Sequence, residues 1–116
     1  MSTHPAEPVT SIAPVFAALG DTKRLLLLSR LSDGRVQTLV QLTEGTGLTR
    51  QGVRKHLGVL EHAGIVFNTR VGRESRYAVR PGRLADACRY LERASRQWDD
   101  ATQRLRELVE DPESTS

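Results

Sequence analysis

The residues of this chain best suited to chemistry are cationic and polar side chains at helical spacing between positions 49 and 56. The set comprises Thr49, Arg50, Gln51, Arg54, Lys55 and His56. Arginine can form two hydrogen bonds with guanine, and glutamine can do the same with adenine. We therefore predict that Arg54 and Gln51, beside Lys55, contact bases in a major groove. Thr49 and Arg50, at the start of the helix, suit phosphates as well as bases.

A second cationic set follows in a pattern typical of a β-hairpin. Residues 65–71 alternate between two faces, residues 72–74 suit a turn, and Tyr77 and Val79 continue a second strand. Three arginines would then gather at the tip of this hairpin: Arg70, Arg73 and Arg76. Such a cluster suits a phosphate backbone or a minor groove. The alternative for both sets is a charged surface that meets only solvent.

The positive charge is concentrated in this part of the chain. Residues 50–83 carry eight arginines or lysines against two glutamates, whereas residues 84–116 carry five basic against eight acidic residues. Residues 1–49 are balanced at four against four, within a net charge of +3 for the whole chain. The segment that holds both cationic sets is therefore predicted to bind a polyanion.

A helix must position the first set, and the apolar spacing predicts one. At about 100° per residue, Val53, Leu57 and Leu60 form one stripe. Thr49 is suited to the N-cap, and a stop at residues 63–64 ends the helix. His56 lies at the edge of the stripe, and we expect it to bond backbone or phosphate rather than serve as a metal ligand.

Three shorter helical patterns precede this helix. Their ranges are 12–19, starting near Pro14; 22–31, capped by Asp21; and about 38–44, after an extended link at 35–37. Residues 45–47, with two glycines, form the turn into the fourth helix. The third and fourth helices are therefore predicted to form a helix-turn-helix.

The last predicted helix runs from Leu84 to about Glu110, between Pro81 and Asp111-Pro112. Its apolar residues recur at alternating steps of three and four, which is typical of a helix packed lengthwise on another helix. They are Leu84, Cys88, Leu91, Ala94, Trp98, Ala101, Leu105 and Leu108. We expect a homodimer through this helix, with help from residues 12–19, because a small domain has no internal partner of that length. Packing within the chain is the alternative.

The whole chain sets the class of fold. Its 116 residues suit one domain, and with 4% aromatic and 38% hydrophobic residues the core must come mainly from leucine and valine on helices. We predict a mostly α fold with a small β-hairpin over residues 12–110, between a flexible segment 1–11 and a disordered tail 111–116. One cysteine, no long apolar run and no leader favour the cytoplasm, with no membrane partner.

Five stretches together resemble the ArsR/SmtB family of dimeric winged-helix repressors. They are Leu19-Gly20-Asp21-Thr22-Lys23-Arg24, Lys55-His56-Leu57, Ala63-Gly64-Ile65-Val66, Gly72-Arg73 and Tyr77. The resemblance covers about residues 12–110 and implies a winged helix-turn-helix that binds double-stranded DNA as a dimer. The segment Arg96-Gln97-Trp98-Asp99 is similar to a branch of the family without obvious metal ligands.

The resemblance also implies where a metal would bind, and the matching positions are poor in ligands. Family members commonly carry a cysteine pair on the third helix, but residues 38–44 contain no cysteine or histidine. A second family site, on the last helix, matches Asp86, Cys88, Asp99 and Thr102, of which only Asp86 keeps the family's residue type. Zinc takes about four N, S or O ligands, so no metal and no cofactor is expected.

Two residues of the last helix have alternative roles. Cys88 is expected to be a small buried hydrophobe of the dimer seam, with redox sensing as the alternative. Trp98 is expected to anchor the core or the interface, with an effector pocket beside it as the alternative. The sequence does not indicate an effector.

These observations favour a sequence-specific transcriptional regulator, most simply a repressor, that binds a palindromic operator as a homodimer. The alternative is a winged-helix interaction module that binds an acidic protein surface instead of DNA. No phosphate-binding glycine loop, nucleophile elbow or carboxylate pair with a histidine indicates an enzyme.

Overall fold

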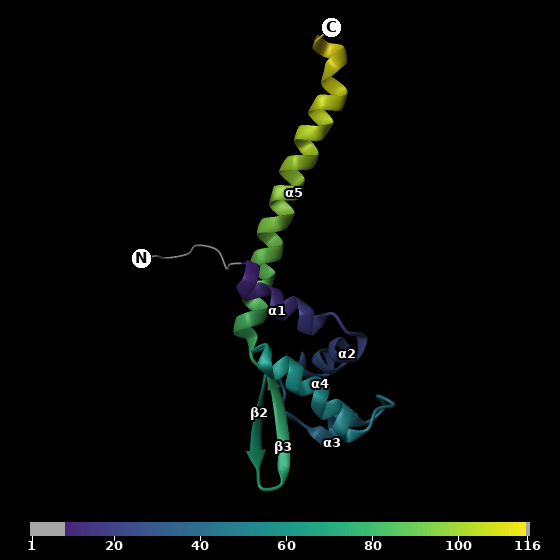
Figure 1. Cartoon of the computed structure of the whole chain (residues 1–116), viewed down its shortest axis with the longest axis vertical. Coiled ribbons are helices and arrows are strands. Elements are labelled where there is room, and N and C mark those ends of the chain that lie inside the picture. Colours follow the sequence, from purple (N-terminus) through teal and green to yellow (C-terminus); the bar gives the residue numbers. More distant parts are fainter. Residues whose placement is uncertain (1–8, 116) are drawn as a thin grey trace, which may run out of the picture.

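A helical body carries two projections that point in opposite directions, a long terminal helix and a β-hairpin (Figure 1). The computed structural model describes residues 9–115, and the side chains of residues 9–110. The described elements follow the order α1, α2, β1, α3, α4, β2, β3, α5. The expected flexible residues 1–8 lie outside this range.

The first helix, α1, spans Val9–Leu19 and therefore begins before the predicted start near Pro14. Pro14 lies inside the helix on its exposed side, although proline removes one backbone hydrogen bond there. Ile12, Val15 and Ala18 are buried on the opposite side. Their packing holds the helix across the proline, so residues 9–11 are helical rather than part of a flexible segment.

The cap that the sequence indicated at α2 is confirmed, and α3 begins with a cap as well. The Asp21 carboxylate accepts hydrogen bonds from the backbone of Lys23 and Arg24 at the start of α2, Thr22–Leu31. Thr38 and Gln41 form a reciprocal capping box at the start of α3, Leu39–Thr43. These side chains satisfy backbone N–H groups that have no partner within their helices.

The predicted helix-turn-helix is formed by α3 and α4, Arg50–His62. Thr49 caps α4 by accepting a hydrogen bond from the backbone N–H of Gly52 at 3.0 Å. Val53, Leu57 and Leu60 are fully buried, as the stripe predicted. The chain leaves the helix through Gly64, whose φ of +79° is costly for any residue with a side chain.

The hairpin consists of β2, Val66–Val71, and β3, Glu74–Val79, joined by Gly72 and Arg73. Glu74 pairs with Val71, so it belongs to the strand rather than to the predicted turn. A short strand β1, Gln37–Thr38, pairs with the other edge of β3 and makes a three-stranded antiparallel sheet of order β1-β3-β2. The extended link expected at residues 35–37 therefore contributes one of its residues to a strand.

The last helix, α5, spans Pro81–Thr115 and is longer at both ends than predicted. Proline suits the first position of a helix because its missing N–H has no helical partner there. At the other end the backbone stays helical past Pro112, where a disordered tail was expected. The first turns pack on the body through Ala87, and through Tyr90, whose ring lies 5.9 Å from that of Phe16.

One core of buried aliphatic side chains joins α1, α2, α3, α4 and the base of the sheet. Its largest fully buried members include Ile12, Leu27, Leu31, Leu42, Leu57, Leu60 and Ile65. None of the described helices combines the length and the apolar character that crossing a membrane requires.

Candidate nucleic-acid interface

The face of α4 opposite the buried stripe is polar and open. Gln51 and Lys55 lie on it, next to Gly58 and His62, and all four residues are exposed. A Cβ atom added to Gly58 would meet nothing within 4 Å. This face therefore offers side chains with donors and acceptors, and a backbone that a partner surface can approach closely.

Thr49 and Arg50 lie where the sequence predicted, at the exposed amino end of α4. The Thr49 hydroxyl oxygen accepts the Gly52 N–H in the cap. Its own hydrogen remains a donor, which is the role that a phosphate contact needs.

Arg54 does not share the outermost face with Gln51 and Lys55. It lies about 90° from the centre of the buried stripe, against about 150° for Gln51, so it occupies the flank of α4. On that flank Arg54 interacts with the Tyr77 hydroxyl of β3. Arg50 and Arg54 line a hollow of about 130 Å³ together with Arg73 of the hairpin turn.

The three hairpin arginines lie at or next to the turn, but they do not share one face. Arg70 pairs with Ser75 and Arg76 pairs with Thr69, so Arg70 and Arg76 lie on opposite faces of the hairpin. Arg76 donates to the Glu74 carboxylate from Nε at 3.0 Å, and its Nη2 lies 2.9 Å from the same oxygen. The alternation of side chains along one strand shows which residues of that strand share a face. The pairing register is needed to show which residues of the neighbouring strand lie on the same face.

Tyr77 of β3 connects the hairpin with α4. Its side chain is buried, and this burial raises the pKa of the phenol above its usual value of 10.0. The Glu61 carboxylate raises the pKa further, while Arg54 and then Arg70 oppose the rise. The neutral hydroxyl is therefore the form present at physiological pH, and its oxygen can accept a hydrogen bond from Arg54.

His56 faces α2 rather than the open side of α4. The histidine is half-buried, and its Nδ1 lies 3.3 Å from Nη1 of Arg24, which fixes Nδ1 as the acceptor because arginine can only donate. Arg24 also donates from Nε to the backbone carbonyl of Ala18 at 2.6 Å. His56 was predicted to bond backbone or phosphate; its observed partner is a side chain, and a phosphate contact through Nε2 stays a prediction.

Sequence reasoning missed a set of α2 cations that brace the helix-turn-helix. Lys23 donates from Nζ to the Thr46 carbonyl in the turn at 2.8 Å. Arg30 donates to the carbonyls of Leu42, at 3.0 Å, and of Glu44. These contacts join residues 12 to 23 positions apart, and no local spacing indicates them.

Asp86 is occupied by two arginines of its own helix. Arg83 Nη1 donates to one carboxylate oxygen at 2.8 Å, and Arg89 Nη2 donates to the other. Cys88 is exposed on the monomer. Among residues 9–110 no three histidine, cysteine, aspartate or glutamate side chains are grouped as a metal site requires.

The predicted dimer face of α5 is largely uncovered in the single chain. Leu84 packs against the core, whereas Leu91, Trp98, Leu105 and Leu108 are 53%, 71%, 60% and 69% exposed. Trp98 borders an open hollow of about 360 Å³ that Tyr90 also lines. Every residue from 102 to 110 is exposed, so the far half of α5 has no cover within the described chain.

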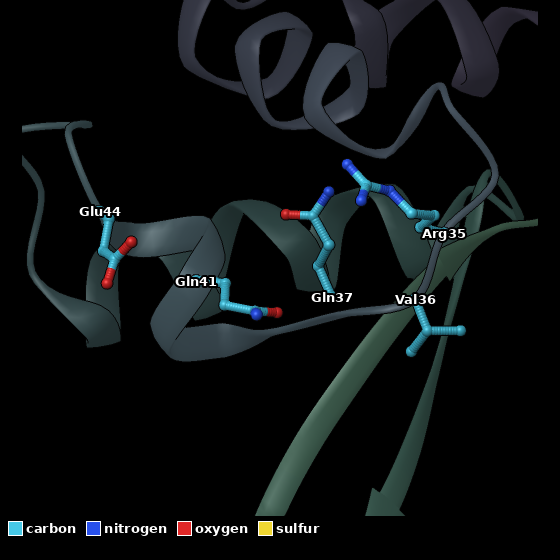
Figure 2. Close-up of a pocket in the computed structure, with 5 residues that line it drawn as sticks. All are labelled: Arg35, Val36, Gln37, Gln41 and Glu44. Carbon is cyan, nitrogen blue, oxygen red and sulfur yellow. The ribbon is translucent and has the colours of Figure 1, made fainter.

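A separate polar hollow of about 260 Å³ lies beside α3 (Figure 2). Its two amide side chains are already used within the fold. Gln37 donates to the Arg30 carbonyl at 2.5 Å, and the Gln41 carbonyl oxygen accepts the Thr38 N–H at 2.9 Å. Because Val36 is directed away from both amides, this hollow presents no converging set of functional groups.

Fold and site together define a winged helix-turn-helix transcriptional regulator, and similarity to known proteins identifies the group. No family model matches the chain. It is 43% identical over 65 residues to the HTH-type transcriptional regulator YuzN of Bacillus subtilis, covering 51% of this chain and 71% of that protein. It is 36% identical over 84 residues to a probable mercury resistance operon repressor of Streptomyces lividans, covering 72% of this chain and 63% of that protein.

Among solved structures, an ArsR-like transcriptional regulator from Rhodococcus sp. RHA1 is similar with a TM-score of 0.71 and 34% identity. The match covers 85% of this chain and 92% of that one. The chain belongs to the ArsR family of transcriptional regulators, as the sequence motifs indicated.

Proposed function

We propose that the protein is a sequence-specific repressor that binds a palindromic operator as a homodimer, with α4 in the major groove and the hairpin as a wing on the backbone. One observation carries the proposal. Three fully buried apolar residues hold α4 from behind, its opposite face is polar and exposed, and its flank lines a hollow through Arg50 and Arg54 together with Arg73 of the wing. Such a surface offers hydrogen bonds to base edges and positive charge to phosphates.

The homodimer in this proposal is formed by α5 with help from α1. Large apolar side chains along α5 are exposed in the single chain, which is unfavourable unless another surface covers them. A two-fold axis would place the two α4 helices about 34–36 Å apart, one turn of DNA. Occupancy of a promoter by this dimer would block transcription in the cytoplasm.

The test begins with selection of duplexes from a randomised pool by the wild-type protein, at about 150 mM salt. The proposal expects a palindromic consensus. Gln51→Ala should lose about 1–3 kcal/mol of discrimination at one base-pair position of each half-site. Gln103→Ala, an exposed glutamine of α5, is the control and should keep the wild-type preference. Enrichment of no sequence over the starting pool would contradict the proposal.

A further inference from the structure

Three arginines from two elements converge on one small hollow. Arg50 and Arg54 reach it from α4, and Arg73 reaches it from the turn of the wing. The rest of its lining comes from Thr38, Leu39, Val40, Glu74 and Ser75. The three guanidiniums carry like charges, so their convergence is unfavourable unless an anion joins them.

Glu74, the acidic residue in the lining, does not neutralise the three arginines. The Glu74 carboxylate is bound by Arg76 on the other face of the wing. Across residues 9–110, Arg50, Arg54 and Arg73 have no ion pair with a carboxylate. The hollow therefore keeps an excess of positive charge and many unused N–H donors.

Size and position narrow the choice of anion. A volume of about 130 Å³ is below the roughly 300–1,000 Å³ of pockets that enclose small organic ligands. The hollow also lies between α4 and the wing, which in the proposed complex face the groove and the adjacent backbone. A phosphate of the DNA backbone fits both the charge and the place.

We propose that this hollow binds a single backbone phosphate in each half-site, and that Arg54 contacts this phosphate instead of a base. The proposal rests on the proposed function and revises the role expected for Arg54 from the sequence. Arg54 lies on the wing side of α4 beside Tyr77, not on the outermost face. Base contacts then fall to Gln51 and Lys55, whose side chains point outward from the open face.

The experiment uses the best duplex selected by the wild-type chain, in two panels. One panel carries every single base-pair substitution, and the other carries a neutral methylphosphonate at each phosphate in turn. We expect one methylphosphonate per half-site to weaken wild-type binding about tenfold, because it removes a contact between charged groups. The same replacement should weaken binding less in Arg54→Ala and in Arg73→Ala than in the wild type.

Two further readouts separate a shared phosphate from independent contacts. The slope of log affinity against log salt should fall by no more than about 0.9 per half-site even in the double variant, because only one phosphate contact is at stake. The Arg54→Ala/Arg73→Ala double variant should lose less than the product of the two single losses. Arg54→Lys, which keeps the charge, should retain part of the affinity.

Arg76→Ala is the matched control, because Arg76 is a wing arginine on the opposite face. It should keep the wild-type response to that methylphosphonate. If Arg54→Ala instead loses discrimination at one base pair and keeps every phosphate response, Arg54 reads a base and the inference is wrong. A wild-type chain that selects no duplex would remove the proposed function, and the inference with it.

Discussion

Arginines of this chain serve different purposes according to their neighbours. Arg24 is held by Asp21, the Ala18 carbonyl and His56, and so it braces α4 from behind. Arg76 is neutralised by Glu74. Arg54 interacts with a neutral phenol and keeps its charge available. The neighbours of each arginine, and not its residue type, therefore indicate which arginine is available to bind a ligand.

Gly64 lies where α4, the wing and the start of α5 meet. Its φ is +79°, and an added Cβ would lie 3.0 Å from Cγ of Arg83. Arg83 in turn donates to the Ser11 carbonyl at 2.5 Å. Gly64→Ala should destabilise the protein by about 1–2 kcal/mol from the backbone conformation alone, measured by urea unfolding. Unchanged stability would show that the helix end rearranges at no cost.

Gly58 is the matched glycine with the opposite expectation. It has a helical φ and open space around it, so Gly58→Ala should stabilise the fold by about 0.5–1 kcal/mol. If α4 lies in a groove at this position, the same change should weaken DNA binding. A variant that is more stable and binds the selected duplex as the wild type does would show that the backbone at Gly58 stays away from DNA.

At the scale of elements, the α2 cap predicts a pH dependence of stability. Hydrogen bonds from the Arg24 and Lys23 backbone to Asp21 hold the pKa of its carboxyl below the usual 3.8. The charged carboxylate stabilises the fold above that pH, and its contribution is lost as the pH falls below it. Asp21→Asn keeps an acceptor for the cap but does not titrate.

The thermal unfolding temperature should therefore drop less in Asp21→Asn than in the wild type when the pH is lowered from about 6 to about 3. Circular dichroism at the two pH values measures both drops. Equal drops would mean that the cap does not distinguish the charged from the neutral carboxyl.

The elements predicted from the sequence were those with local signals. Asp21 and Thr49 cap the helices that they were expected to cap, and the third helix begins next to Thr38, close to its expected start. Helix ends marked by Pro14 and Pro112 were wrong, because core packing carries α1 across one proline and the backbone of α5 continues past the other. A proline disfavours a helix locally, but favourable tertiary packing can outweigh that local effect.

The candidate site was predictable only in part. The open face of α4 followed from helical spacing, which is a local property. Strand β1 exists only through its pairing with β3, about forty residues along the chain, and the face of Arg76 follows from the same sheet register. The contact between Arg24 and His56 likewise depends on how α2 and α4 pack.

At the scale of the whole molecule, the single chain is unusually extended. Its radius of gyration is 20.2 Å, against about 13 Å for a compact domain of this length. Most of the difference comes from α5, which projects away from the body (Figure 1). A helix gains most of its stability from packing, so the projecting half should be covered in the working protein.

Leu105→Glu tests whether a second copy provides that cover. The change would place a charge in the apolar stripe of both copies, and should weaken dimerisation at least about a hundredfold. Gln103→Glu, on the opposite side of α5, is the control and should leave the dimer intact. Sedimentation velocity over a range of concentrations measures both. Dimers of unchanged stability in Leu105→Glu would place the interface elsewhere.

We expect two copies of the chain to bind one duplex through their α4 helices and wings. Sedimentation of a labelled duplex carrying the selected palindrome tests it most directly, because mass and binding are measured together. We predict two chains on each duplex at about 150 mM salt, with an affinity that falls steeply as salt rises. A chain that sediments as a monomer, and leaves the duplex unbound even in dilute salt, would contradict this account.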